Sequence, residues 1–385
     1  MRYVKQTYYD TFQCTADKCP DTCCAGWQIV IDEATLEKYE NCVTECAERI
    51  RTKADADSTI FDAGLANAID WKEGCFKQYN RRCAMLNEQN LCDLIIEKGE
   101  EWLCDTCKRY PRHIEEFDGV REMSLSLSCP VAAEIMLKSE EKMQFLVTED
   151  EKADPLEEEF ENFDFLLYTQ LEDARDVLFS IVQNRKLPME KRMILILQMA
   201  KEMQECLDEE RLFDMEDVIG KYAVCPVSNV ELDSEKRFTY LKENFEVFYK
   251  LERLRPEWSA VVDSAKETLY GGDKEQYIHI YNAFEKEFVT GFGKKRWEIF
   301  AEQILMFFLY TYFCGAVYDD CIYSKVGMAV FSAVYIQEFI MCAWYLNDKK
   351  MDFEECIRIA YRYAREVEHS DENLITLEEW LLERM

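Results

Sequence analysis

Hydrophobic residues beyond residue 156 recur at the spacing of amphipathic helices. Ile196, Ala200, Met203 and Leu207, for example, follow one another at intervals of four, three and four residues. These intervals place the four side chains on one face of a helix. Glycine, which interrupts helices, is scarce in this part of the chain. The pattern therefore predicts an α-helical bundle.

Two stretches of this part are apolar enough to raise the question of a membrane span. Ile304–Tyr318 lacks charge but is shorter than the ~18–20 residues that cross a bilayer. Val326–Leu346 is long enough but is interrupted by Glu338. Both stretches are predicted to be buried helices, with their methionines and aromatic rings in the core, and we expect no membrane partner.

Local signals predict where individual helices begin. Pro188 and Pro256 each stand where a new helix would start, because proline fits the first helical turn. Near the end of the chain, Thr376 and Glu379 have the spacing of a capping box. We therefore expect a last short helix that starts at Thr376.

An acidic segment predicts a domain boundary. Glu149–Asp164 holds nine acidic residues against the single Lys152. Asp154-Pro155, within this segment, has the form of a helix start. We expect a cysteine-rich domain over residues 1–148 and an α-helical domain over residues 149–385.

Residues 1–135 lack helical periodicity over long stretches and are rich in cysteine and short polar segments. Within them, Ile29–Tyr39 and Glu40–Arg51 are predicted to be helical, and Asp55–Gly74 to be a loop or hairpin. Asp118-Gly119, a turn signal between two short extended runs, predicts one small hairpin. The predicted fold is thus mainly α: a loop-rich cysteine domain with a small hairpin, followed by a helical bundle.

Charge narrows the range of functions. The formal net charge is −31. A nucleic-acid-binding surface needs a basic stripe to neutralise phosphates, so no nucleic-acid partner is expected. Such an acidic chain can attract cationic groups, such as lysine side chains or a sulfonium cofactor, or can serve only as a soluble surface. The first residues have no apolar core of the kind found in signal peptides, and we expect a cytoplasmic protein.

The distribution of cysteine is unusual for a cytoplasmic protein. Twelve of the 18 cysteines precede residue 130. Because a reducing cytoplasm disfavours a disulfide framework, a cluster of this kind is more often metal-binding or catalytic. The first third of the chain is therefore predicted to be a metal or iron–sulfur domain.

The spacing of these cysteines supports metal binding. One group follows the pattern Cys14-x4-Cys19-x3-Cys23-Cys24, and Cys104-x2-Cys107 forms a knuckle. Thiolates a few residues apart on a loop can converge on one ion or cluster. The predicted metal ligands are Cys14, Cys19, Cys23, Cys24, Cys83, Cys92, Cys104, Cys107 and Cys129.

Spacing leaves the identity of the metal open. The chain has only three histidines, so a zinc site would consist mostly of cysteines. A 4Fe–4S cluster also takes four thiolates. Gly26 stands where radical enzymes that cleave S-adenosylmethionine carry their third cysteine, which argues against a radical mechanism.

Other enzyme signatures are absent from the sequence. It contains no G-x-x-x-x-G-K-[ST] phosphate loop, no G-x-G-x-x-G fingerprint and no H-E-x-x-H zinc motif. It also lacks a G-x-S-x-G nucleophile elbow. These absences argue against phosphate-loop enzymes, dinucleotide-binding enzymes, Rossmann-type methyltransferases and serine hydrolases.

The motifs occur in a recognisable order over roughly residues 8–138. They are Cys19-Pro20-Asp21-Thr22-Cys23-Cys24-x-Gly26-Trp27 after Cys14, then Ile31-Asp32, Arg82-Cys83, Leu91-Cys92, Leu103-Cys104-x-Thr106-Cys107, Tyr110-Pro111-Arg112, and Ser124-Leu125-x-Leu127-Ser128-Cys129-Pro130. This order resembles the CxxCxxCC family of zinc- or iron-chelating proteins, and more closely its flagellin lysine-N-methylase branch.

The resemblance implies transfer of methyl groups from S-adenosylmethionine to lysine ε-amines of flagellin, with an iron–sulfur cluster in the enzyme. A lysine must first lose its proton, and its unperturbed pKa is ~10.4. Tyr110, next to the knuckle, is a candidate base by position or an ordinary packing residue. Arg112 is a candidate for holding the carboxylate of S-adenosylmethionine or for a structural ion pair.

Two other interpretations remain open. The cysteines could hold a structural zinc or iron in a non-catalytic protein of metal or cluster handling, whose helical domain docks a partner. A methylase could also act on a lysine-bearing protein other than flagellin, because the flagellin substrate is implied only by the resemblance.

Overall fold

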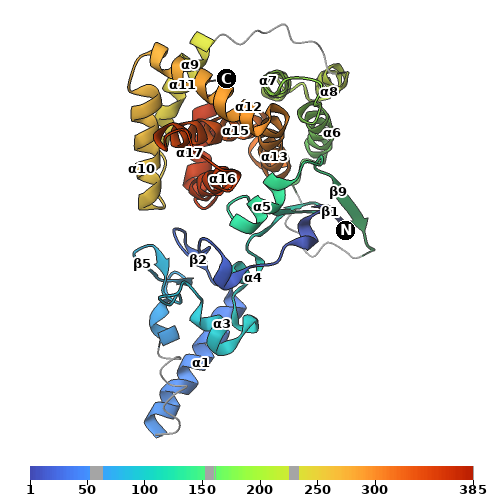
Figure 1. Ribbon diagram of the computed structural model, residues 1–385. Helices are drawn as coiled ribbons and strands as arrows, with labels where there is room; N and C mark the ends of the chain where they lie inside the picture. The colour runs from blue at the N-terminus through green and yellow to red at the C-terminus, as the bar shows by residue number, and fades with distance from the viewer. Residues whose placement is uncertain (53–63, 152–159, 161, 225–233, 385) are drawn as a thin grey trace. The chain divides into compact units, whose positions relative to one another are not determined.

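The computed structural model describes residues 1–52, 64–151, 160, 162–224 and 234–384 (Figure 1). The chain forms two compact units. The cysteine-rich unit consists of residues 13–113 and 129–131. The helical unit consists of residues 1–12, 114–128 and 132–385. The predicted division of the chain at 148/149 stays a prediction, and the helix start predicted at Asp154-Pro155 lies outside the described residues.

A four-stranded sheet holds the N-terminus of the chain. Its strand order is β7-β8-β1-β9. β1 (Arg2–Gln6) runs parallel to β8 (Val120–Leu125) and antiparallel to β9 (Phe145–Glu149). β7 (Arg112–Phe117) is joined to β8 by a two-residue turn in which Gly119 has φ +66°, a value that glycine adopts without strain. The hairpin predicted at Asp118-Gly119 is confirmed.

Helices form most of the remaining described residues of the helical unit, which confirms the prediction of a mainly α protein. The α-helices are α5 (Pro130–Lys138), α6 (Phe165–Val182), α7 (Met189–Asp208), α8 (Met215–Ala223), α9 (Ser234–Asn244), α10 (Pro256–Ala265), α11 (Lys274–Phe284), α12 (Thr290–Phe292), α13 (Lys294–Tyr312), α14 (Ala316–Asp319), α15 (Ile322–Leu346), α16 (Phe353–Glu368) and α17 (Asp371–Leu382). The 3-10 turns are η1 (Tyr9–Thr11), η5 (Leu212–Asp214), η6 (Phe245–Tyr249) and η9 (Phe313–Gly315), and the π-helical turns are η7 (Lys266–Tyr270) and η8 (Glu285–Val289).

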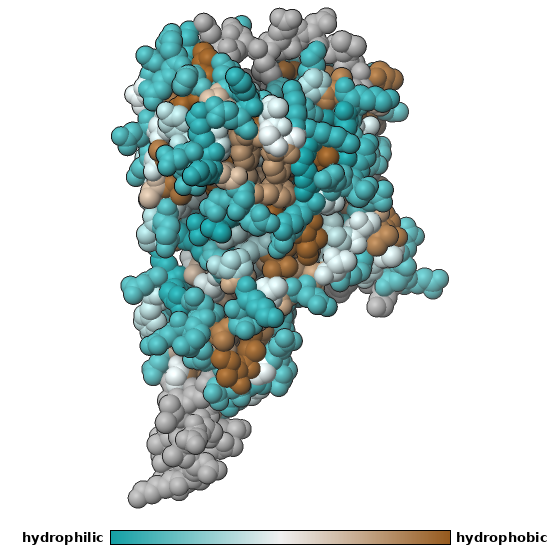
Figure 2. Space-filling model, in the orientation of Figure 1, coloured by the Kyte–Doolittle hydropathy of each residue, from teal (hydrophilic) through white to brown (hydrophobic). Residues whose placement is uncertain are grey.

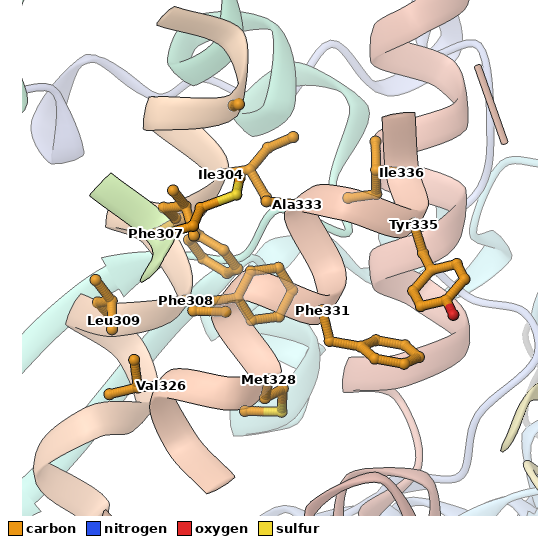
Figure 3. Close-up of a cluster of buried hydrophobic side chains, with 14 of the residues drawn as sticks. Ile304, Phe307, Phe308, Leu309, Val326, Met328, Phe331, Ala333, Tyr335 and Ile336 are labelled. Atoms are coloured by element: carbon orange, nitrogen blue, oxygen red, sulfur yellow. The ribbon is translucent and has the colours of Figure 1, made fainter. Parts of the chain in front are cut away.

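The core of the helical unit lies around α15. This helix contacts α7, α10, α11, α13, α16 and α17, which surround it in Figure 1. Phe307 and Phe308 of α13 belong to the same cluster of buried hydrophobic side chains as Met328 and Phe331 of α15 (Figure 3). Burial of such side chains contributes roughly 1.5–3 kcal/mol each. This packing gives the bundle its stability.

The two apolar stretches of the sequence belong to this core. They correspond to Lys294–Asp319 and Ile322–Leu346, which are long and apolar enough to cross a bilayer by composition. Their most apolar windows are 89% and 83% buried inside the protein. The prediction that both are buried helices is confirmed.

Predicted helix boundaries agree with the structure at two places and fail at a third. Pro188 caps α7 and Pro256 opens α10, as predicted. Thr376 does not begin the last helix but lies inside α17. That helix starts at Asp371, because the Ser370 hydroxyl accepts a hydrogen bond of 3.2 Å from the amide of Asn373.

The cysteine-rich unit contains short elements joined by loops. They are η2 (Ala16–Lys18), β2 (Ile29–Val30), α1 (Glu33–Thr52), β3 (Ile69–Asp70), β4 (Cys75–Phe76), β5 (Gln78–Tyr79), β6 (Arg82–Cys83), α3 (Asp93–Lys98), η3 (Glu100–Trp102) and α4 (Asp105–Arg109). The two helices predicted over residues 29–51 are one, α1, and Ile29 begins a strand instead. Part of the loop predicted at Asp55–Gly74 lies outside the described residues. Figure 2 shows hydrophobic atoms gathered over α3, where Ile95 and Ile96 are exposed.

A buried histidine joins the end of α16 to the chain beyond β8. The His369 ring nitrogen Nε2 lies 2.9 Å from the Ser128 hydroxyl oxygen. Burial, and secondarily the guanidinium groups of Arg365 and Arg255, lower the pKa of His369 to about 3. The ring is therefore neutral in the folded protein at pH 5, whereas an unfolded chain protonates it below pH ~6.5.

We expect the helical unit to lose stability as pH falls. Because the folded pKa of His369 is depressed, its contribution is present above pH ~6.5 and is lost as pH falls toward 3. At pH 5 the loss amounts to about 2 kcal/mol. Urea unfolding of wild type and His369→Gln at pH 7 and pH 5 measures it. In His369→Gln, the free energy of unfolding should fall by about 2 kcal/mol less between pH 7 and pH 5 than in wild type. The control His279→Gln, which changes an exposed histidine, should behave as wild type.

Candidate functional site: a cysteine cluster and a charged cavity

One carboxylate fixes the loop that carries the Cys104–Cys107 knuckle. Asp32 Oδ2 accepts a hydrogen bond of 2.9 Å from the amide of Asp105, and its Oδ1 accepts one of 2.9 Å from the amide of Thr35. Burial raises the pKa of Asp32, but these amide donors outweigh it and lower the pKa overall. The Thr106 hydroxyl also donates to the carbonyl of Val30 at 2.8 Å. Asp32 thus ties the start of α1 to the start of α4.

The two thiols of the knuckle interact with each other. Cys104 precedes α4 and Cys107 lies within it, so one helical turn brings the side chains together. Their hydrogen bond lowers the pKa of Cys104 and, with burial, raises the pKa of Cys107. Cys104 is therefore the more acidic thiol of the pair.

The Cys23-Cys24 segment is held against β6. The amide of Cys83 donates to the carbonyl of Cys24 at 2.9 Å, and the indole of Trp27 donates to the carbonyl of Cys23 at 2.7 Å. The sulfur atoms of Cys23 and Cys24 are 3.7 Å apart. Gly26 has φ +90°, a value that strains other residues, so a cysteine is disfavoured at this position by the backbone as well.

Six of the nine predicted ligands lie within electrostatic range of one another. Burial first, and then the neighbouring Cys92, Cys104 and Cys23, raise the pKa of Cys83 to about 12. The pKa of Cys92 is raised in the same way. The pKa of Cys24 is raised by its hydrogen bond with Cys23, then by burial and by other thiols of the group. We call these six residues the thiol cluster: Cys23, Cys24, Cys83, Cys92, Cys104 and Cys107.

The thiol cluster has the donors that a metal needs, although its sulfur atoms do not form a finished site. Within the described ranges, no three His, Cys, Asp or Glu side chains are close enough to hold a metal ion as they stand. Buried thiols repel one another as thiolates, and a bound cation removes that penalty. The chemistry of the donors fits a four-thiolate zinc or iron–sulfur site. The assignment of individual ligands stays a prediction.

The other predicted site residues have local contacts. Cys14 is exposed and its sulfur accepts from the amide of Ala16 at 3.4 Å. The Cys19 thiol donates to the carbonyl of Asp21 at 2.9 Å. Cys129 is buried. The structure does not test their roles as ligands.

The two candidate catalytic residues are both partly buried. The ring of Tyr110 lies 6.0 Å from that of Trp27, which itself contacts the Cys23 carbonyl. Arg112 is half-buried at the start of β7. Whether Tyr110 acts as a base and Arg112 holds a cofactor stays a prediction.

Sequence reasoning missed Tyr39. Its buried ring stacks on Trp102 at 6.3 Å, and its hydroxyl donates to the Trp102 carbonyl. Burial, and then the charges of Cys104, Cys107 and Cys92, raise the pKa of Tyr39. The sequence gives little indication of this role, because a single tyrosine on a predicted helix face has the pattern of an ordinary core residue.

A second candidate site is a cavity inside the helical unit. Its volume is ≈ 60 Å³, and residues of α7, α9, α11, η8, α13 and α15 line it. The apolar part of its wall includes the rings of Phe284 and Trp297, which pack edge to face at 5.6 Å. Its charged lining residues are Glu190, Arg237, Glu285, Lys294, Glu298 and Glu338.

At the buried end of the cavity, Glu338 and Arg237 form an ion pair in which the carboxylate has all the hydrogen-bond partners it needs. Glu338, 2% exposed, accepts hydrogen bonds from the Arg237 guanidinium at 2.8 Å and from the hydroxyls of Tyr277 and Tyr270 at 3.0 and 2.9 Å. A buried charge needs such partners to offset its desolvation. Glu338 was visible in the sequence as the lone charge inside an apolar run, where it was used only to argue against a membrane span.

The more exposed end is acidic. Glu298 pairs with Arg192 at 3.1 Å, and burial raises the pKa of Glu298. Burial, and then the charge of Glu190, raise the pKa of Glu285. Within the described part of the chain, the Glu285 carboxylate accepts no hydrogen bond and forms no ion pair. Lys294 also lines the cavity and partly offsets the charges of Glu285 and Glu298. The carboxylates of Glu190, Glu285 and Glu298 still outnumber the cationic groups of Lys294 and Arg192, so this end of the cavity favours a cation.

The molecule thus combines a thiol-rich unit with a helical unit that holds an acidic cavity. Residues 175–385, more than half of the chain, match the family model described as the FliB lysine N-methylase C-terminal domain. The chain belongs to this family. Every residue that lines the cavity lies within the matched region.

Curated relatives agree with this family. The flagellar biosynthetic protein FliU of Salmonella muenchen is 30% identical over 132 residues, which are 34% of this chain and 75% of that protein. A lysine-N-methylase of Salmonella typhimurium is 30% identical over 140 residues, or 36% of this chain and 33% of the relative. A lysine-N-methylase of Salmonella choleraesuis is 30% identical over 132 residues, 34% of this chain and 31% of the relative. The chain therefore matches about a third of the length of each methylase. Among solved structures, none matches the chain significantly.

Proposed function

We propose that the protein is a lysine N-methyltransferase that moves a methyl group from S-adenosylmethionine to lysine ε-amines of flagellin or another flagellar protein, in the cytoplasm. Membership of the lysine N-methylase family carries the proposal. The names of the relatives, two lysine-N-methylases and a flagellar biosynthetic protein, support a flagellar substrate. The net charge of −31 suits a partner that presents lysines.

The proposed reaction is a direct displacement. The lysine nitrogen forms a bond to the methyl carbon while the carbon–sulfur bond of the sulfonium breaks and its electron pair stays on sulfur. The ammonium of lysine must lose a proton before attack, because its unperturbed pKa is ~10.4. A protein carboxylate or phenolate would accept that proton. The products are S-adenosylhomocysteine and a methylated lysine.

The thiol cluster would hold the proposed iron–sulfur cluster, with zinc as the alternative. Such a group, when bound, supplies Lewis-acidic metal ions that hold several thiolates together. The residues of the chain contribute the scaffold: Asp32 fixes the knuckle loop, and the Cys24 carbonyl fixes β6. These contacts between distant parts of the sequence support six of the nine proposed ligands, namely the members of the thiol cluster.

Anaerobic purification followed by iron, sulfide and zinc assays tests the metal, and methyl-labelled S-adenosylmethionine with purified flagellin tests the activity. We expect iron and sulfide in the protein and label in flagellin lysines. Zinc without iron, together with no transfer to flagellin or to whole-cell protein, would favour the non-catalytic metal-binding protein and overturn the proposal. Label in another protein but not in flagellin would correct the substrate only.

A further inference from the structure

We infer that the charged cavity of the helical unit binds the side chain of the substrate lysine through its ammonium group. The inference rests on the proposed function, because that function supplies a lysine-bearing substrate. The cavity itself is independent of that proposal: it is lined by six helical elements that the fold brings together from residues 189–341.

Charge selects the kind of ligand. The lining holds four carboxylates and two cationic groups, so its formal charge is −4 + 2 = −2. Arg237 is already engaged by Glu338 at the buried end, at 2.8 Å. At the accessible end, Lys294 offsets only part of the charge of Glu285, whose carboxylate is half-buried and forms no ion pair among the described residues, so its charge is costly there. A cation in the cavity would remove that penalty, whereas an anion would add to it.

The shape of the wall selects an alkylammonium over a metal ion. The aromatic residues Tyr281, Phe284 and Trp297 line the cavity, together with Met189, Met193 and Met341. Aromatic faces attract ammonium groups, including methylated ones, and apolar walls accept the methylene stem of a lysine. Mg²⁺ or Ca²⁺ would instead need six or more oxygen ligands. The Arg237 guanidinium already lies 5.1 Å from the Tyr281 ring, which shows that this ring accepts a cation.

Size excludes the methyl donor as the occupant of the cavity. A volume of ≈ 60 Å³ holds the tip of a lysine or a few water molecules, not an adenosine group. Two π-helical turns contribute to this part of the helical unit: η8 supplies Glu285 and Val289, and η7 supplies Tyr270, which donates a hydrogen bond to Glu338. Such turns occur frequently at functional sites.

The test compares Glu285→Gln with the matched control Glu287→Gln. Glu287 lies two residues away and pairs with Lys349 at 2.7 Å, outside the cavity lining. With the protein as purified, steady-state methyl transfer gives KM and kcat for flagellin. Isothermal titration gives the affinity for flagellin in the absence of S-adenosylmethionine. Thermal unfolding confirms that both variants are folded.

We expect Glu285→Gln to raise KM for flagellin and to weaken its binding by at least 10-fold, with a smaller change in kcat and none in the KM for S-adenosylmethionine. Met193→Trp, which fills the cavity, should have the same signature, and Glu287→Gln should match wild type. Wild-type transfer with unchanged KM and binding in both cavity variants would overturn the inference and leave the proposed function standing. Glu285-dependent binding of flagellin without any methyl transfer would leave the lysine site standing and overturn the proposed function.

Discussion

Cys107→Ser protein purified without oxygen is expected to hold less than half of the wild-type metal and to transfer methyl groups about 100-fold more slowly. Cys107 is hydrogen-bonded to Cys104 and lies in electrostatic range of Cys83 and Cys92, so it interacts with three other members of the thiol cluster. A serine hydroxyl keeps the shape of the side chain but is a poor ligand for zinc or iron. Even losses in the outer shell of a metal site reduce affinity or activity about 10- to 100-fold.

The matched control is Cys321→Ser. Cys321 is a half-buried thiol of the helical unit that donates to the carbonyl of Asp319 at 3.1 Å, a bond that serine can keep. It should retain the metal, the visible spectrum and the activity of wild type. Full metal content in Cys107→Ser would refute its assignment as a ligand. Loss of metal with unchanged methyl transfer would show that the metal serves only stability.

The helical fold could be predicted from the sequence because its determinants are local. The apolar face of α7 and the proline starts of α7 and α10 are read within one or two helical turns. The start of α17 was missed because tertiary contacts compete with the local signal. Asn373 forms hydrogen bonds with the backbone of Glu252 and Glu366, which fixes the helix start at Asp371, after the capping residue Ser370, instead of at Thr376.

The thiol cluster could be predicted only in part. The density and short spacing of the cysteines identify the knuckle and the Cys23-Cys24 segment as candidate metal-binding segments. The approach of Cys24 to Cys83 depends on backbone hydrogen bonds across some sixty residues, which no spacing rule contains. Asp32 shows the same limit: its role appears only when α1 and α4 are side by side.

The cavity could not be predicted, because six helical elements from different parts of the chain form it. Glu285, for example, lies on a π-helical turn, where the 3.6-residue period that assigns faces does not hold. Glu338 was the one available signal. A lone carboxylate inside a long apolar helix indicates buried partners, and here these are Arg237 and two tyrosines.

A buried ion pair joins the sheet to the bundle in the helical unit. Both terminal nitrogens of Arg175 on α6 donate to the carboxylate of Glu122 on β8, and both side chains are nearly inaccessible to water. Phe179 and Tyr310 lie 5.9 and 5.5 Å from the guanidinium. The arginine has therefore been removed from water with this carboxylate as its main counter-charge.

Glu122→Ala is expected to destabilise the helical unit by about 3–5 kcal/mol, because it leaves Arg175 buried without its counter-charge. Urea unfolding followed by circular dichroism of the helices measures this loss. Glu116→Ala, which removes a half-exposed carboxylate 3.4 Å from Arg121, should change stability by less than about 1 kcal/mol.

The double variant Glu122→Leu/Arg175→Met separates the two causes of that loss. Removing both charges and keeping the apolar volume should restore most of the stability, since an isolated buried charge is worse than an apolar pair. If the double variant is as unstable as Glu122→Ala, the two hydrogen bonds between Arg175 and Glu122 are themselves needed to hold β8 against α6. If it recovers, the penalty of an unpaired charge explains the loss, and the bidentate geometry contributes little beyond neutralising the charge.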